Sequence, residues 1–217
     1  MPFPPEPASR FRCRLLAHWP VKFAGTVAGM IAFFLGYFWV LRHPIRPVTI
    51  LPLTAIDRWI PLQPRALVLY LSLWIYVSLA PALLTERREL VSYAFAAIEL
   101  ALAGLAIFYL WPTAVPIPDV NWNDYPTLAF LKSADASGNA CPSLHVAFAV
   151  FSALWIGRTL VRMRTAPALR VVNWLWCVGI IYSTVAIRQH VAIDVLTGLP
   201  LGAAFAAIHL RRLRVAS

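Results

Sequence analysis

Six long apolar runs constrain the fold of this chain more strongly than any other feature of its sequence. A helix needs about 20 apolar residues to cross the hydrocarbon core of a bilayer. The whole chain is 60% hydrophobic and only 13% charged, which excludes an ordinary soluble domain. We therefore expect an all-α fold, a polytopic membrane protein built as a bundle of six transmembrane helices. These helices are predicted at residues 22–41, 66–84, 91–111, 143–163, 171–188 and 191–210.

The charged and proline-rich segments divide the chain into three parts. Residues 1–21 are predicted to be a disordered N-terminus, residues 22–210 the membrane domain, and residues 211–217 a basic tail. The formal net charge of +10 would indicate nucleic-acid binding in a soluble protein. Here the arginines flank apolar spans, so we interpret them as topology signals and as contacts to anionic lipids. Membrane lipids are therefore the expected partners, and nucleic acid is not.

The distribution of arginine and lysine predicts the orientation in the membrane. With the N-terminus in the cytoplasm, thirteen basic residues fall on the cytoplasmic side and six on the other. Both termini are then cytoplasmic, in a cell inner or plasma membrane, and the loops at 42–65, 112–142 and 188–190 lie on the opposite face. Segment 42–65 alone carries four arginines among tryptophan and proline residues, a mixture typical of a segment that lies along the interface.

Two polar clusters interrupt the apolar sequence at this non-cytoplasmic face. One is the run from Cys141 to His145, and the other contains Ser183, Thr184, His190 and Asp194. Ionisable side chains at membrane depth are costly, so they are candidates for function. The fourth and sixth spans both begin at this face, and the N–H groups at a helix N-terminus favour a phosphate.

The spacing of these residues predicts nucleophilic chemistry on phosphorus. His190 and Asp194 are four residues apart and therefore share one face of a helix. The carboxylate can accept the Nδ1 proton of the imidazole, which leaves the other ring nitrogen free to attack. His145 precedes His190 by 45 residues, enough chain to cross the bilayer and return to the same face. We expect it to protonate the leaving oxygen as a general acid.

Three further residues are candidates for substrate binding. Ser143 can bond a phosphoryl oxygen through its hydroxyl and N–H groups, or it can simply cap the helix that follows. Arg188 can neutralise charge that develops in the reaction, or it can anchor a lipid phosphate. Lys132 is a candidate for the same role, with a solvated loop charge as the alternative.

Two histidines and one aspartate can also bind iron or zinc, which leaves a metal site as an alternative. No further ligand cluster accompanies them in the sequence, so we expect neither a metal nor another cofactor. The cysteines, Cys13, Cys141 and Cys177, are widely spaced and predict no disulfide framework.

These motifs resemble those of the type 2 phosphatidic acid phosphatase superfamily. Thr184 stands where arginine is usual in the third motif, S-R-x5-H-x3-D, and the first motif, K-x6-R-P, is absent. The resemblance implies a six-helix fold and a metal-free mechanism through a phosphohistidine. It also implies that His190 is the nucleophile, Asp194 its orienting partner and His145 the acid. The second motif, P-S-x-H, is matched by Pro142, Ser143 and His145, and the third by Ser183, His190 and Asp194.

The departures from the family pattern resemble one branch of it, which holds inositol phosphorylceramide synthases and sphingomyelin synthases. That branch also lacks the paired basic motif, and segments 54–61 and 112–116 are similar to it as well. A phosphodiester carries one negative charge and a monoester nearly two, so a site short of cations is better matched to a diester. The resemblance implies an inositolphosphotransferase-like activity on phospholipid head groups.

Three functions are compatible with these residues. The first is an enzyme that transfers or hydrolyses a phospholipid head group through a phosphohistidine. The second is a phosphatase that only hydrolyses a lipid phosphate or an isoprenoid pyrophosphate at the same site. The third is a non-enzymatic transporter or lipid-binding subunit. It requires a continuous polar pathway through the bundle, whereas the polar residues of this chain gather at one face.

Overall fold

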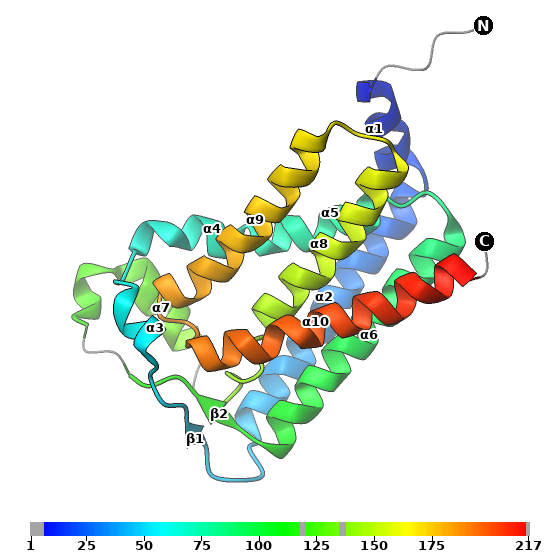
Figure 1. Ribbon diagram of the computed structural model, residues 1–217. Coiled ribbons are helices and arrows are strands. Elements are labelled where there is room, and N and C mark those ends of the chain that lie inside the picture. Colours follow the sequence, from blue (N-terminus) through cyan, green and yellow to red (C-terminus); the bar gives the residue numbers. More distant parts are fainter. Residues whose placement is uncertain (1–6, 118–119, 135–137, 216–217) are drawn as a thin grey trace, which may run out of the picture.

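The computed structural model describes residues 7–117, 120–134 and 138–215, and its elements are mostly helices (Figure 1). Within these residues, six helices are long and apolar enough to cross a membrane, which confirms the predicted fold class. Their ends lie within a few residues of the predicted ones in most cases. The spans are α2 (Trp19–Arg42), the interrupted helix Pro64–Ala82, α6 (Arg87–Leu110), α8 (Leu144–Arg162), α9 (Pro167–Ala186) and α10 (Ala192–Val215).

The second span is broken into three pieces, which the sequence pattern did not predict. They are η1 (Pro64–Ala66), α4 (Leu67–Leu71) and α5 (Leu73–Ala82). The interruption lies at Ser72, whose hydroxyl donates to the carbonyl oxygen of Leu69 at 2.6 Å and accepts from Trp176 Nε1 at 2.8 Å. A serine hydroxyl that bonds the preceding turn competes with the helix ladder. The break leaves backbone carbonyls of α4 available to side chains from other helices.

The N-terminal segment also differs from the prediction of disorder over residues 1–21. Residues Pro7–Leu16 form helix α1, and α2 already begins at Trp19. Arg14 Nη1 donates to the carbonyl oxygen of Leu83 at 3.0 Å, and Lys22 Nζ donates to that of Ala82 at 2.9 Å. Carbonyls at the end of a helix lack partners within it, so these two cations dock the segment onto the end of α5. Residues 1–6 lie outside the described part of the chain.

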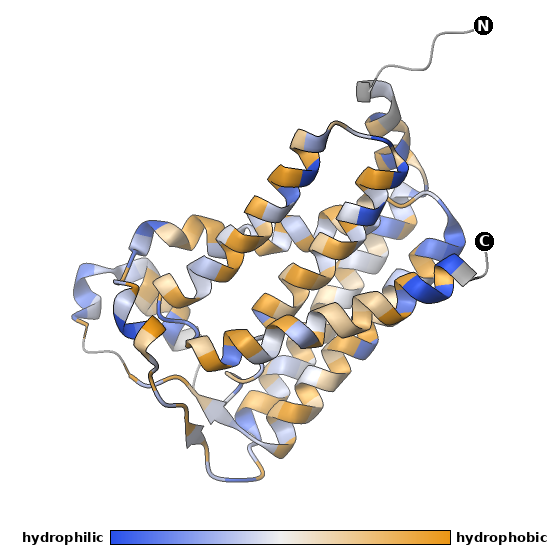
Figure 2. Ribbon diagram, viewed as in Figure 1, coloured by the Kyte–Doolittle hydropathy of each residue, from blue (hydrophilic) through white to orange (hydrophobic). Residues whose placement is uncertain are grey.

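The connections gather at one end of the bundle, which we call the strand end. There β1 (Thr49–Ile50) and β2 (Thr113–Ala114) pair in parallel, with Thr49 opposite Thr113. The short helices α3 (Ala55–Trp59), η2 (Trp122–Asp124) and α7 (Pro126–Ala134) lie at the same end, whereas both ends of the described chain lie at the other (Figure 1). Figure 2 shows apolar residues along the spans and hydrophilic residues concentrated towards the two ends. The orientation with cytoplasmic termini stays a prediction.

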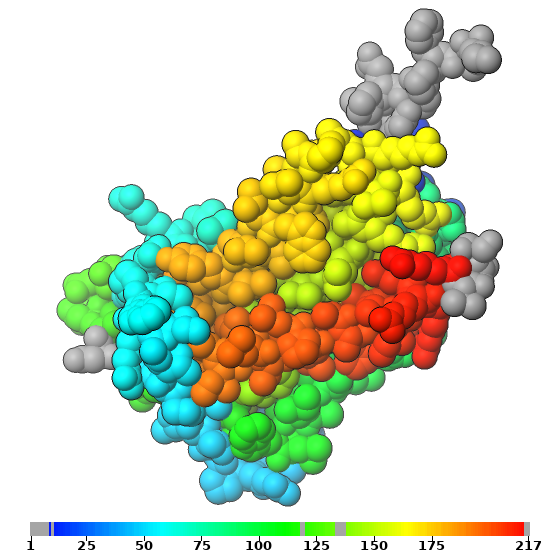
Figure 3. Space-filling view, in the orientation of Figure 1, coloured from blue at the N-terminus to red at the C-terminus, as the bar shows by residue number. Residues whose placement is uncertain are grey.

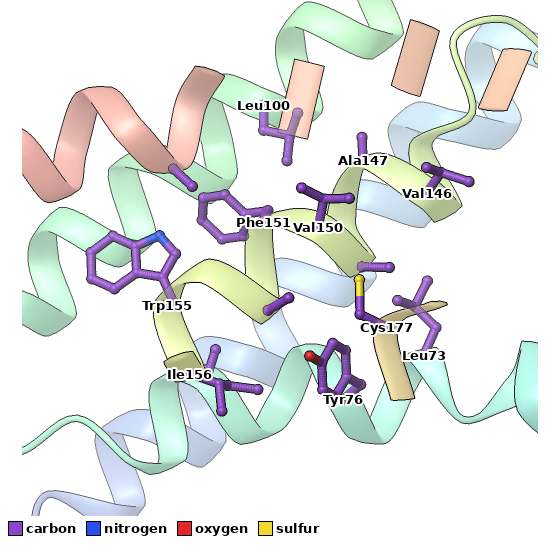
Figure 4. Close-up of a cluster of buried hydrophobic side chains, with 14 of the residues drawn as sticks. Leu73, Tyr76, Leu100, Val146, Ala147, Val150, Phe151, Trp155, Ile156 and Cys177 are labelled. Atoms are coloured by element: carbon purple, nitrogen blue, oxygen red, sulfur yellow. The ribbon is translucent and has the colours of Figure 1, made fainter. Parts of the chain in front are cut away.

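Helix α8 forms the centre of the core and contacts α5, α9 and α10. Figure 4 shows its Val150, Phe151 and Trp155 among buried residues from neighbouring spans. A buried polar link crosses this core, because the Tyr76 hydroxyl donates to Asn173 Oδ1 at 2.7 Å and Asn173 Nδ2 donates to the carbonyl oxygen of Ala153 at 3.0 Å. The position of α8 is therefore fixed by packing and by directional bonds, and its N-terminus is held at the strand end.

Candidate active site

The site forms where α8 and α10 cross closely at the strand end. Gly198 and Gly202 of α10 face the N-terminal turns of α8. A Cβ atom at Gly198 would lie 2.5 Å from the carbonyl oxygen of Ser143, and one at Gly202 would overlap the carbonyl of Ala147. Small residues four apart let two membrane helices approach to backbone contact. At this contact the N–H group of Ser143 donates to the carbonyl oxygen of Asp194 at 2.9 Å.

His190 and Asp194 form a directly bonded pair at the start of α10. His190 Nδ1 lies 3.0 Å from Asp194 Oδ2, as the spacing of four residues predicts. A carboxylate can only accept in this bond, so the Nδ1 atom carries the proton. The Nε2 atom then presents its lone pair, and it has no hydrogen-bond partner among the described residues. Asp194 is fully buried and His190 is 7% exposed, so the pair lies in a sheltered position.

His145 enters the same site from the first turn of α8. Its Nε2 atom lies 3.0 Å from the carbonyl oxygen of Tyr70, next to the break in the second span. Its ring stacks on that of Tyr70, with centroids 3.8 Å apart and planes 8° apart. The carbonyl oxygen can only accept, so Nε2 carries a proton. The Nδ1 atom can then bind a second proton, which makes the imidazole positively charged. His145 lies two residues after Ser143, whose N–H group donates to the carbonyl oxygen of Asp194, so the first turn of α8 lies beside the His190–Asp194 pair.

Ser143 serves as the N-cap of α8. Its Oγ accepts from the N–H group of Val146 at 3.2 Å, and its own N–H group donates to the carbonyl oxygen of Asp194. The hydroxyl proton is the group that Ser143 still offers to a substrate oxygen. The N–H groups of Leu144 and His145, in the first turn of α8, have no partner among the residues that the structure describes. These amides and the hydroxyl together form a donor set at a helix N-terminus.

Arg188 lies beside the pair but points its guanidinium at another part of the chain. Its Nη1 donates to the carbonyl oxygen of Asp57 at 2.5 Å, and its Nη2 to that of Ile60 at 2.8 Å. Its backbone has φ 62°, the left-handed conformation that closes the C-terminus of α9. Gln189 N–H donates to Thr184 O and Arg188 N–H to Val185 O, both at 3.0 Å, which completes this turn. A direct role of Arg188 on substrate stays a prediction.

Lys132 lies on α7, which also belongs to the strand end. Its Nζ atom lies 6.0 Å from the centre of the Trp122 ring, a cation–π contact. The neighbouring Leu128 and Leu131 pack with Tyr70, the residue that stacks on His145. The structure therefore brings α7 near the site, and binding of substrate by Lys132 stays a prediction.

Two residues that the sequence did not single out for the site contribute contacts to it. The carbonyl oxygen of Tyr70 bonds His145 Nε2. The buried Asp57 of α3 accepts from the N–H group of Ala192 at 2.7 Å, and Ala192 lies two residues after His190. Tyr70 lies in the second span and Asp57 in segment 54–61, and neither has a spacing that links it to the two polar motifs, so the sequence did not place either at the site. The nearby Cys141 is buried, and this burial raises the pKa of its thiol. No three His, Cys, Asp or Glu side chains within the described ranges gather closely enough to bind a metal ion.

Comparison with protein families identifies the chain. Residues 81–215 match the family model described as the PAP2 superfamily, which is more than half of the chain. The chain belongs to the PAP2 superfamily. The resemblance read from the P-S-x-H and H-x3-D residues is thereby confirmed at the level of the superfamily. Comparisons with curated proteins and with solved structures found no match.

Membership in the PAP2 superfamily indicates the class of reaction and of substrate. The PAP2 superfamily consists of phosphatases and phosphotransferases, and lipid phosphates are its general substrate class. The matched region holds His145, His190 and Asp194, together with Gly198 and Gly202. Tyr70 and Asp57 lie outside it, in the part of the chain before residue 81. The site of this PAP2 protein is therefore completed by segments that precede the matched region.

Proposed function

We propose that this PAP2 protein is an integral membrane lipid phosphotransferase or phosphatase that acts through a phosphohistidine on His190. The observation that carries the proposal is the 3.0 Å bond between His190 Nδ1 and Asp194 Oδ2, which leaves Nε2 as an available nucleophile. Superfamily membership supports it, and so does the bond from Ser143 N–H to the carbonyl oxygen of Asp194, which places the first turn of α8 and His145 beside the pair.

In the first step, His190 Nε2 attacks the phosphorus atom of the substrate, and the bond from phosphorus to the leaving oxygen breaks. The imidazole becomes positively charged as the N–P bond forms, and Asp194 stabilises this charge through Nδ1–H. His145 in its protonated form donates a proton to the leaving oxygen. The hydroxyl of Ser143 and the amides of Leu144 and His145 donate to the phosphoryl oxygens.

In the second step, a lipid alcohol or water attacks the phosphohistidine. His145, now neutral, accepts the proton of the attacking hydroxyl, and the N–P bond breaks to restore His190. An alcohol yields transfer of the phosphoryl-containing group, and water yields hydrolysis. The same residues therefore catalyse both outcomes, and the choice depends on which acceptor reaches the intermediate.

A phosphodiester substrate, the head group of a phospholipid, is favoured by the scarcity of cations at the site. No arginine or lysine side chain bonds to His145, His190 or Asp194 among the residues that the structure describes. Arg188 is bound by two carbonyl groups, and Lys132 contacts Trp122. A monoester with nearly two negative charges would need more cationic partners than a diester with one. This favours the branch that resembles inositol phosphorylceramide synthases.

The experiment is an assay of the purified protein in detergent with a panel of labelled phospholipids and lipid phosphates, in which the products of transfer and hydrolysis are separated. We expect turnover of a diester by the wild type and none by His190→Ala, although that variant still folds. Wild-type turnover by His190→Ala on the same substrate would reject the mechanism. Hydrolysis of monoesters alone would instead support a lipid phosphate phosphatase.

A second measurement addresses the alternative of a metal site. We expect full activity after exhaustive treatment with chelators, because the proposed steps use only nitrogen and oxygen groups of the chain. Loss of activity on chelation that returns with zinc or iron would favour the metal-dependent alternative.

A further inference from the structure

The turn that carries His190 is held at both ends by one short segment, residues 57–63, from the connection between α2 and α4. On one side, Arg188 donates to the carbonyl oxygens of Asp57 and Ile60. On the other side, the N–H group of Ala192 donates to Asp57 Oδ1 at 2.7 Å. A further bond runs from the N–H group of Gln63 to the carbonyl oxygen of Ala186 at 2.8 Å. Figure 3 shows the segment around α3 lying directly against the start of α10.

The carboxylate of Asp57 replaces a missing cap at the N-terminus of α10. Helix N-termini need an acceptor for their first N–H groups, usually a Ser, Thr, Asp or Asn at the preceding position. Val191 stands there in this chain and has no acceptor in its side chain. Asp194, in the first turn, bonds His190 through Oδ2 and therefore does not cap the helix. The acceptor comes instead from Asp57, which lies 135 residues earlier in the chain than Ala192.

Asp57 is itself held rigidly. It is 1% exposed, and its Oδ2 accepts from the N–H group of Thr54 at 2.7 Å and from the Thr54 hydroxyl at 2.8 Å. A buried carboxylate with both oxygens bonded is fixed in position, and its negative charge suits the positive end of α10. The position of Ala192 relative to α3 is thus determined, and His190 lies between Ala192 and the anchored Arg188.

We propose that Asp57 is a positioning residue for the nucleophile. Asp57 orients His190 Nε2 in two ways: its carboxylate caps α10, and its carbonyl oxygen accepts from Arg188. This inference rests on the proposed function, because it assigns Asp57 a part in the placement of His190 for attack on phosphorus. Asp57 itself touches neither substrate nor the reacting atoms. A misplacement of a reacting group by about 1 Å can reduce a rate about 100-fold.

The test compares Asp57→Ala and Asp57→Asn with the milder variant Thr54→Ala and with one control variant, Asn173→Ala, in the same assay. Thr54→Ala removes a hydroxyl bond to Asp57 but leaves the bond to Ala192. Asn173→Ala removes two buried hydrogen bonds that join α9 to α5 and to α8, away from His190, and so controls for lost stability. We expect Asp57→Ala to lower kcat about 100-fold with KM changed less than about threefold. Asp57→Asn, which still offers an oxygen to Ala192 N–H, should lose less than Asp57→Ala. Thr54→Ala, which keeps the backbone bond from Thr54 to Asp57, should lose less than either Asp57 variant, and Asn173→Ala should keep kcat within about threefold.

The inference would be overturned if folded Asp57→Ala and Asp57→Asn both kept the kcat of Asn173→Ala. If Asp57→Ala does not fold, Asp57→Asn decides by the same comparison. In each case the proposed function stands as long as the wild type turns over and His190→Ala does not, so the two failures are distinguishable.

Discussion

The N–H group of Ser143 donates to the carbonyl oxygen of Asp194 at 2.9 Å, which joins the two polar motifs of the chain through their backbones. This bond forms because Gly198 and Gly202 let α10 lie directly on the first turns of α8. Helices that are far apart in sequence thereby bring His145 and the His190–Asp194 pair to one place. The geometry of the site depends on this crossing as much as on the reactive side chains.

A methyl group at the crossing should separate the two helices. Gly198→Ala and Gly202→Ala each place a Cβ against a backbone carbonyl of α8, and overpacking of this kind costs about 1–3 kcal/mol. We expect a lower midpoint of thermal unfolding in detergent and a loss of activity for both variants. Gly25→Ala is the matched control, since a Cβ at Gly25 meets nothing within 4 Å. Equal midpoints for the three variants would contradict the close crossing.

Asp194→Asn should remove most of the activity while keeping the size of the side chain. An amide that donates to Nδ1 favours the imidazole tautomer with its proton on Nε2, which blocks the nucleophilic lone pair. By analogy with orienting carboxylates elsewhere, we expect kcat to fall by roughly 10³–10⁴-fold. Steady-state kinetics with the best substrate of the panel measure this. A kcat within tenfold of the wild type would mean that the 3.0 Å bond to His190 is structural only.

Two substitutions of Arg188 separate its role in the chain from a role on substrate. Its φ of 62° is a left-handed conformation that glycine adopts freely, whereas alanine pays about 1 kcal/mol. Both variants lose the guanidinium, so a contact with substrate predicts the same rise in KM in both, whereas the left-handed backbone predicts a difference in thermal midpoint between them. We expect Arg188→Ala to unfold at a lower temperature than Arg188→Gly. A raised KM with unchanged stability in both variants would favour the direct contact.

Cys141 should react slowly with thiol reagents at neutral pH. Burial raises the pKa of its thiol, so the group is protonated at pH 7 and the reactive thiolate is scarce. We expect maleimide to label Cys13, which is exposed, much faster than Cys141, and the rate at Cys141 to rise as the pH increases. Mass spectrometry of digested protein follows each site. Equal rates at pH 7 would contradict the burial of Cys141.

The same exposed cysteine tests the predicted orientation. Cys13 lies on α1, at the end of the bundle away from the strand end. If the N-terminus is cytoplasmic, a membrane-impermeant maleimide should label Cys13 in cells only after permeabilisation. A variant with cysteine in place of the exposed Ile117, at the strand end, should show the reverse pattern. Labelling of Cys13 in intact cells would place the site on the cytoplasmic face.

The sequence predicted those features that depend on composition and local spacing. The length of apolar runs located the spans, and the interval of four residues placed His190 against Asp194, because both follow from helix geometry. The contacts of Tyr70 and Asp57 could not be predicted, since they join residues 75 and 135 positions apart through the packing of whole helices. The break at Ser72 was missed for a similar reason: its hydroxyl bonds Trp176, a partner on another span.

The support that Tyr70 and Asp57 give to the site has a consequence for how this protein can be dissected. A fragment restricted to the region that matches the family, residues 81–215, would retain the two histidines and the aspartate. It would lack the carbonyl oxygen of Tyr70, which bonds His145. It would also lack the carboxylate of Asp57, which caps the helix that follows His190. We therefore expect the minimal active unit to extend upstream of residue 81, at least to the connection that contains residues 54–63.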